Sequence, residues 1–278
     1  MNKLSSVIVF SLALSATAAG ADKMQYPLSV AAAPDGAIYV ADKDMHGVWK
    51  IAGGKLEVFF QGSNKFRTPL NAVRCVAVDT KGRVLAGDSS TREIYRFNAE
   101  GKPEPLSKAG IGIPMAIAFD ARGDILVCDL EIHQIVKVPE AGGEPVKVAD
   151  VTAPRGIVVD AQERIWVVSA GGKNQVVRIL PDGKVETVVA GTPFQLPHTI
   201  ALDKDQNAYI CDNYAESIWK VSPDGKPEKW LTGKPLVKPV GITFATDRLL
   251  IADPHAKTVF EATLDGKLSP VKFETAGN

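Results

Sequence analysis

One histidine of this sequence stands where it could take part in proton transfer. His198 follows Pro197, and Asp212 comes 14 residues after His198, at the end of the next apolar run. An imidazole titrates near neutral pH, and a carboxylate beside it orients the ring and stabilises its charged form. His198 and Asp212 are therefore the candidate catalytic residues, as a general acid or base and its partner.

Other residues are suited to binding. Arg74 and Arg155 each begin an apolar run, and guanidinium groups bind carboxylates and phosphates through paired N–H donors. Met115 begins a third such run, and Phe66 lies in the longest linker of the chain, 61–73. These four are the candidate ligand-binding residues. We expect a small polar or anionic ligand, such as a sugar acid or a peptide carboxylate, with a protein or peptide as the alternative partner.

A competing interpretation gives the two arginines a structural role and no part in ligand binding. Each could pair with a neighbouring aspartate, such as Asp88, and simply seal a central channel of the fold. Charged residues of a loop such as 61–73 are also usually just exposed to water.

These residues sit at fixed places in a sixfold repeat. Each unit has four short runs rich in Val, Ile and aromatic residues, bounded by turn residues such as 34–36 and 181–183. Such a unit is an antiparallel meander, and six units packed radially leave only short edges. We therefore predict an all-β fold, a six-bladed β-propeller with four antiparallel strands per blade. The blades begin near 27, 69, 114, 154, 197 and 239.

The register of the units places one residue of each at the same end of a central channel. In a meander the first strand leaves one face and the second strand returns to it, and we call this the top face. The channel positions on the top face are Leu28, Arg74, Met115, Arg155, His198 and Val240. The residues that end the second runs are Asp42, Asp88, Asp129, Ser169, Asp212 and Asp253.

The five aspartates invite a metal hypothesis. Carboxylates are the ligands that hard divalent cations prefer. A carboxylate repeated at strand ends also accepts backbone N–H groups of the following turn, and we favour this architectural role. No metal site and no cofactor is implied, and a divalent cation has no further support.

The third runs carry aromatic residues at one equivalent position. Trp49, Tyr95, Trp219 and Phe260 occupy it in four blades. We predict that they form interblade core. The segment 267–273 supplies the last strand of the sixth unit, so we expect blades one and six to close by side-chain packing.

The repeats resemble the NHL repeat. The resemblance rests on Pro154-Arg155-Gly156-Ile157, on Asp42 to Val48 and on Asp129 to Ile135, and it extends over about 27–273. Two units keep the histidine of the family, His46 and His133, which we expect to tie a loop to its blade. The resemblance implies an NHL-type six-bladed propeller related to gluconolactonase-like and streptogramin lyase-like propellers.

The enzymes with this architecture match the sequence only in part. Gluconolactonase-like lactonases hold a divalent metal with Glu, Asn and Asp side chains at channel positions, where this chain has Leu28, Met115 and Val240. Streptogramin-type lyases resemble it more at Leu196-Pro197-His198, but they have seven blades and a Glu where Asp212 stands.

The net charge argues against nucleic-acid binding, and the N-terminal sequence predicts export. Lys plus Arg number 32 and Asp plus Glu number 32, so the neutral chain lacks the basic surplus that nucleic-acid binding needs. Residues 1–21 match a signal peptide, with Lys3, an apolar stretch at 7–14 and cleavage after Ala18 or Ala21. We expect a soluble product, exported to the periplasm or the exterior without a transmembrane anchor, with 22–278 as its single domain.

Two functions remain after these observations. The first is an exported module that binds its ligand or protein partner at the channel mouth of the top face. The alternative is a lyase or hydrolase that uses His198 with Asp212.

Overall fold

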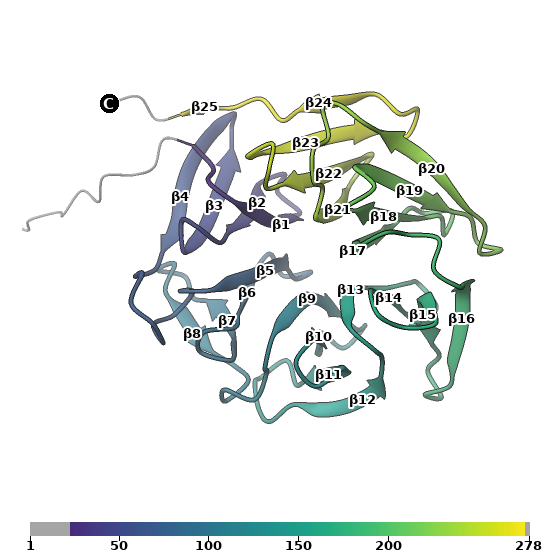
Figure 1. Ribbon diagram of the computed structural model, residues 1–278. Coiled ribbons are helices and arrows are strands. Elements are labelled where there is room, and N and C mark those ends of the chain that lie inside the picture. The colour runs from purple at the N-terminus through teal and green to yellow at the C-terminus, as the bar shows by residue number, and fades with distance from the viewer. Residues whose placement is uncertain (1–22, 276–278) are drawn as a thin grey trace, which may run out of the picture.

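The computed structural model describes residues 23–275, and every regular element in this range is a β-strand. The predicted signal peptide, 1–21, lies outside the described residues. Six four-stranded antiparallel blades surround a central axis, which confirms the predicted six-bladed propeller (Figure 1). Residues 23–275 contain no helix that could cross a bilayer.

The first three blades are formed by twelve consecutive strands. Their bounds are β1 (Pro27–Ala32), β2 (Ile38–Asp42), β3 (Gly47–Ala52) and β4 (Lys55–Gln61); β5 (Val73–Val78), β6 (Val84–Asp88), β7 (Glu93–Phe97) and β8 (Pro103–Pro105); β9 (Pro114–Phe119), β10 (Ile125–Asp129), β11 (Gln134–Val138) and β12 (Val146–Asp150).

The other three blades follow the same order. Their bounds are β13 (Pro154–Val159), β14 (Ile165–Ser169), β15 (Asn174–Ile179) and β16 (Val185–Ala190); β17 (Pro197–Leu202), β18 (Ala208–Asp212), β19 (Ser217–Val221) and β20 (Pro227–Thr232); β21 (Gly241–Ala245), β22 (Arg248–Asp253), β23 (Thr258–Thr263) and β24 (Leu268–Pro270).

The second strand of each blade is the most deeply buried. β2, β6, β10 and β18 are buried at every residue, because each face of the strand packs against a neighbouring blade. This explains why the second runs are continuously apolar rather than alternating. The first strands surround the axis, so their edges line the channel (Figure 1).

The aspartates that end these strands have the predicted architectural role. Asp42 accepts hydrogen bonds from the backbone N–H groups of Gln25 and Tyr26, in the preceding segment, and of Asp44 and Met45, in the following turn. The same two-sided bonding recurs at Asp88, Asp129, Asp212 and Asp253. Each carboxylate therefore fastens the chain that enters its blade to the turn that follows the second strand.

His46 and His133 tie linkers to blades, as predicted. Nδ1 of His46 lies 2.6 Å from the carbonyl oxygen of Asn71, and Nδ1 of His133 accepts from the N–H of Ala153 at 2.8 Å. Both residues have a positive φ. The turn keeps the same backbone shape in three other blades although the residue type differs. The residues with positive φ there are Arg92, Glu216 and Lys257.

The third-strand aromatics pack between blades, as predicted. Trp49 lies in one cluster with Leu250 and Val259 of the sixth blade, and Tyr95 packs with Tyr39 of the first. Phe260 and Trp219 occupy the equivalent clusters; the ring of Trp219 is 5.3 Å from that of Phe194.

The closure of the ring differs in one respect from the expectation. β24 completes the sixth blade, and the Trp49 cluster joins blades six and one through side chains. In addition, β25 (Glu274–Thr275) pairs in parallel with β4 at Lys55 and Leu56. Side-chain packing alone was therefore an incomplete prediction, because backbone pairing also links the C-terminal segment to blade one.

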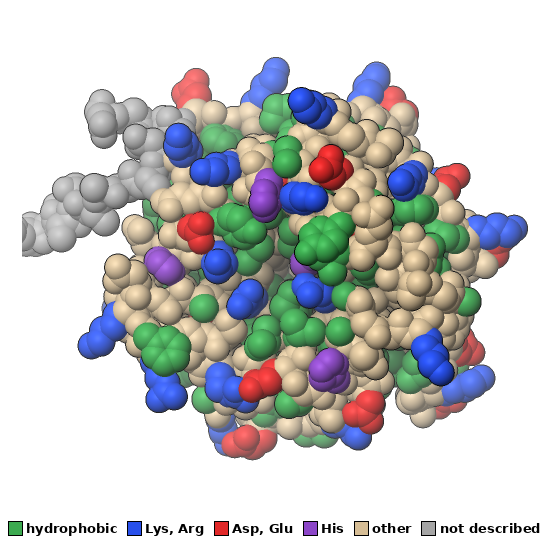
Figure 2. Space-filling view, in the orientation of Figure 1, with side chains coloured by type: hydrophobic (Ala, Val, Ile, Leu, Met, Phe, Trp, Pro, Cys, Tyr) green, Lys and Arg blue, Asp and Glu red, His purple; other side chains and the backbone are tan. Residues whose placement is uncertain are grey.

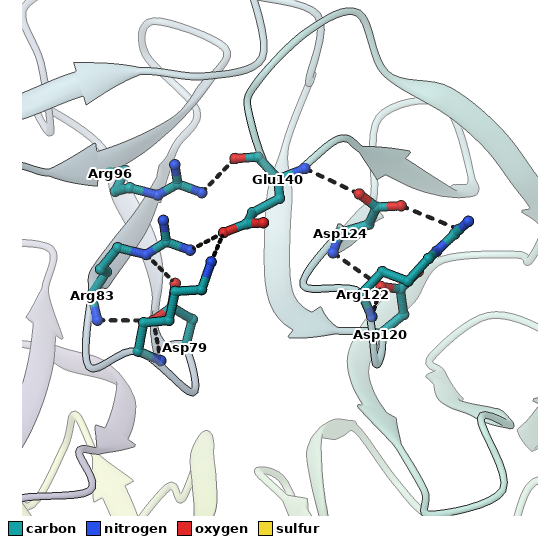
Figure 3. A network of polar contacts seen from close by, with 8 residues as sticks. Asp79, Arg83, Arg96, Asp120, Arg122, Asp124 and Glu140 are labelled. Atoms are coloured by element: carbon teal, nitrogen blue, oxygen red, sulfur yellow. Dashed lines mark hydrogen bonds and ion pairs between the residues drawn. The ribbon is translucent and has the colours of Figure 1, made fainter.

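A polar cluster joins blades two and three on the face opposite the top face (Figure 3). One carboxylate oxygen of Glu140, in the turn after β11, accepts from Lys81 at 2.5 Å and from Arg83 at 2.6 Å. Its backbone oxygen accepts from Arg96, and its backbone N–H donates to Asp124. The hydrogen bonds from Lys81 and Arg83 lower the pKa of Glu140 to about 2.

We expect Glu140→Gln to lower the melting temperature at pH 7. Because the folded state holds the pKa below its ordinary value of 4.5, this stabilisation is present above pH 4.5 and is lost as the pH falls towards 2. The effect is modest, since the carboxylate is partly exposed to water. Thermal unfolding of both proteins between pH 7 and pH 2 measures it.

The matched control is Glu144→Gln, which removes the same charge from a loose, exposed pair with Lys108. A Glu140→Gln deficit that equals the control, or that persists unchanged at pH 2, would contradict this assignment.

Candidate functional site at the channel mouth

The six predicted channel positions meet in one small cavity on the top face. Its volume is about 90 Å³, and we call it the mouth cavity. It is lined by Leu28, Arg74, Met115, Arg155, His198, Thr199 and Val240. The structure therefore brings together four of the six candidate site residues. Their functional roles stay predictions.

Close packing of the inner strands brings two of these residues together. Arg155 and Gly156 are the second and third residues of β13, which lies beside β17. A Cβ atom on Gly156 would stand 2.6 Å from the carbonyl oxygen of His198, so a larger residue would push the strands apart. Glycine at this position lets Arg155 and His198 face the same cavity.

The arginines of the mouth have no carboxylate partner. Nε of Arg74 donates to the hydroxyl of Ser89 at 3.1 Å, and Nε of Arg155 is buried without any hydrogen-bond partner. None of the ion pairs among residues 23–275 includes either arginine. Asp88 is occupied by backbone and side-chain donors of its own turn, among them Thr91. The interpretation in which aspartates neutralise the arginines is therefore wrong.

The charges of the mouth repel one another. Burial lowers the pKa of Arg155, and the positive charge of Arg74 lowers it further. Around the centre of the face in Figure 2, hydrophobic side chains lie together with Lys or Arg side chains, while the acidic side chains lie further out. The cavity is therefore electropositive.

His198 is held in its neutral form. Burial, followed by the charge of Arg155, lowers its pKa from 6.5 to about 3. Asp212 does not compensate, because its oxygens accept from the N–H groups of Gln195 and Leu196 and from the indole of Trp219. No hydrogen bond joins Asp212 to His198 in the described part of the chain. The structure thus places His198 at the mouth but does not pair it with Asp212, and a catalytic role for either stays untested.

Phe66 does not line the mouth cavity. Its side chain is 70% exposed, and the guanidinium of Arg67 lies 5.5 Å from the centre of its ring. The binding role predicted for Phe66 therefore stays an expectation without support from the geometry.

One aromatic near the mouth escaped the sequence analysis. Tyr214, in the turn after β18, is 61% exposed and lies close enough to Arg155 for its charge to affect the pKa of that guanidinium. The ammonium group of Lys238 lies 5.3 Å from the centre of its ring. The available signal was a large aromatic in a turn next to an aspartate that ends a second strand.

The mouth does not suit a metal ion. No group of three or more His, Cys, Asp or Glu side chains able to hold a metal occurs within residues 23–275. The mouth offers one imidazole beside two guanidinium groups, and these cations would repel a divalent ion. The metal that serves gluconolactonase-like lactonases therefore does not fit these residues.

A longer cavity lies beneath the mouth along the axis. Its volume is about 380 Å³, and residues from all six inner strands line it, including Val30, Val76, Ile117 and Ile200. Thr199 lines both cavities, so they adjoin. We call this second space the channel. Its lining side chains are mostly apolar.

Comparison with known proteins identifies the family. The family described as the SMP-30/gluconolactonase/LRE-like region matches residues 12–204, which is more than half of the chain. The chain belongs to this family.

Solved structures share the fold at low sequence identity. A streptogramin B lyase has a TM-score of 0.69 at 17% identity, with 91% of this chain and 85% of that chain covered. A gluconolactonase from Xanthomonas campestris has a TM-score of 0.72 at 16% identity, with 90% and 87% covered. A chain of a nidogen/laminin complex gives 0.69 at 19%, with 82% and 89% covered. These similarities show the propeller fold alone.

Curated relatives match only a segment. The E3 ubiquitin-protein ligase TRIM32 of Homo sapiens is 31% identical over 83 residues, which are 30% of this chain and 12% of that protein. The Mus musculus protein of the same name is 31% identical over 81 residues, 29% of this chain and 12% of that protein. The match thus spans about an eighth of the length of either relative.

His198→Asn should make the protein more resistant to acid. The folded state holds the pKa of His198 at about 3, so below pH 6.5 the unfolded chain binds a proton that the folded chain does not, and stability falls. Relative to the variant, the wild type should lose up to about 1.4 kcal/mol per pH unit between pH 6 and pH 4. Urea unfolding across this range measures the difference.

His255→Asn is the control, because that histidine is exposed. If both variants show the same pH dependence as the wild type, His198 is not the buried neutral group described above.

Proposed function

We propose that this protein is a binding module that takes a small anionic ligand into the mouth cavity. The observation that carries the proposal is Nε of Arg155, which is buried without a hydrogen-bond partner in a cavity that Arg74 also lines and that holds no carboxylate. A buried polar donor without a partner destabilises the protein, and an anion would supply the missing acceptor. It would also relieve the repulsion between the two guanidinium groups.

His198 would strengthen binding at acidic pH. Its imidazole shares the cavity with Arg155, whose charge now opposes protonation. A bound anion would offset that charge and raise the pKa of His198, so anion binding should take up a proton. Affinity should therefore increase as the pH decreases from 7 to 5.

Calorimetric titration with sodium acetate and sodium phosphate tests the proposal. We expect heat of binding for the wild type, and a loss of at least tenfold in affinity for Arg74→Gln with Arg155→Met, because guanidinium contacts to anions are charge-assisted. Arg122→Gln is the control, since that arginine is 73% exposed in the β9–β10 turn, on the opposite face.

Binding that is equal in the double variant and in the control would place the anion elsewhere on the protein. The absence of binding to the wild type would refute the proposal.

The alternative is a lyase or hydrolase that uses His198. Two structural neighbours are a streptogramin lyase and a gluconolactonase, and His198 is a neutral imidazole at the mouth, the form that a general base requires. Asp212 would contribute only through the fold, since its oxygens are occupied. Turnover of lactones, esters or cyclic depsipeptides that disappears in His198→Ala would favour this alternative.

We also propose that the module is exported and that its repeats are of the NHL type. The N-terminal pattern of Lys3, an apolar stretch and small residues supports export. The loop contacts of His46 and His133 support the NHL assignment.

A further inference from the structure

The cations occupy only part of the mouth, and the rest is apolar. Arg74, Arg155 and His198 come from blades two, four and five. Leu28 and Val240, from the adjacent blades one and six, form an apolar wall on the other side. A ligand that fits this cavity therefore needs an anionic end and an apolar part next to it.

The mouth cavity offers few neutral side chains that could hydrogen-bond the hydroxyl groups of a ligand. The hydroxyl of Thr199 donates to the carbonyl oxygen of Val240 and is already committed. Among the residues that line the cavity, no other neutral side chain carries a hydroxyl or an amide. With its carboxylate on the two guanidinium groups, a sugar acid would bury most of its hydroxyls without partners, which is unfavourable.

The channel continues the apolar wall inward. Leu28 is followed in β1 by Ser29 and Val30, which both line the channel, and Thr199 joins the two spaces. At about 380 Å³ against about 90 Å³, the channel is much larger than the mouth cavity. The mouth thus has room for a carboxylate group, and a chain attached to it would enter the channel.

We propose that the ligand is a carboxylic acid with an apolar chain, with its carboxylate at Arg74 and Arg155 and its chain in the channel. This inference rests on the proposed function. It narrows the ligand class to amphipathic carboxylates and excludes sugar acids.

Calorimetric titration with sodium acetate, butanoate, hexanoate and octanoate tests the inference, with gluconate and hexanamide as comparison ligands. Each buried methylene should strengthen binding by about fourfold until the channel is filled. Gluconate should bind no better than acetate, and hexanamide should bind far more weakly than hexanoate because it lacks the charge.

A variant of the channel tests where the apolar chain of the ligand lies. Thr243 lines the channel on β21 and is absent from the mouth, so Thr243→Phe should abolish the dependence on chain length and leave acetate binding unchanged. Circular dichroism verifies that the variant folds. If the variant does not fold, the titrations of the wild type from acetate to octanoate still test the inference.

The outcomes separate this inference from the proposed function. If acetate binds but longer chains bind no better, or if gluconate matches hexanoate, the inference is wrong and anion binding stands. If none of the carboxylates binds, the inference is wrong, and the proposed anion binding fails as well only if phosphate does not bind either.

Discussion

The structure depends on a carboxylate that fastens two segments of backbone at the end of the second strand. In five blades an aspartate accepts N–H groups from the segment entering the blade and from the turn after the strand. Buried backbone donors need partners, and these aspartates satisfy several at once. Because the same tie recurs around the ring, the inner strands begin at the same height, and their first side chains meet at one mouth. In the fourth blade Ser169 takes the place of the aspartate. Its hydroxyl donates to the carbonyl oxygen of Thr152 and accepts from the N–H of Gly172.

The same interaction determines the charge of the mouth. Asp88 and Asp212 each accept several donors from neighbouring segments, and neither makes a hydrogen bond or ion pair to an arginine among residues 23–275. Arg74 and Arg155 are therefore left without carboxylate partners although acidic residues stand nearby in the sequence. A neutral chain thus carries a local concentration of positive charge where its six blades converge. Such a cavity favours an anion over a metal cation.

Much of this arrangement was predictable from the sequence, because the repeat supplies six observations of one register. The spacing from His198 to Asp212 matches that from Arg74 to Asp88, and this constancy correctly placed the channel positions. Contacts that do not repeat could not be found in this way. Tyr214 and Glu140 each occur in one blade, and their partners come from other turns or blades. Proximity in register also suggested a His198–Asp212 pair, which fails because backbone donors occupy the aspartate.

The most direct test of the account is a crystal structure with bromide, located by its anomalous scattering. The central claim is that backbone donors hold the aspartates and leave two guanidinium groups without a carboxylate partner, free to bind an anion. We predict a bromide peak in the mouth cavity between Arg74 and Arg155, with Asp88 and Asp212 bonded to backbone N–H groups as described here. A mouth without bromide, in which either carboxylate instead contacts an arginine, would contradict the account.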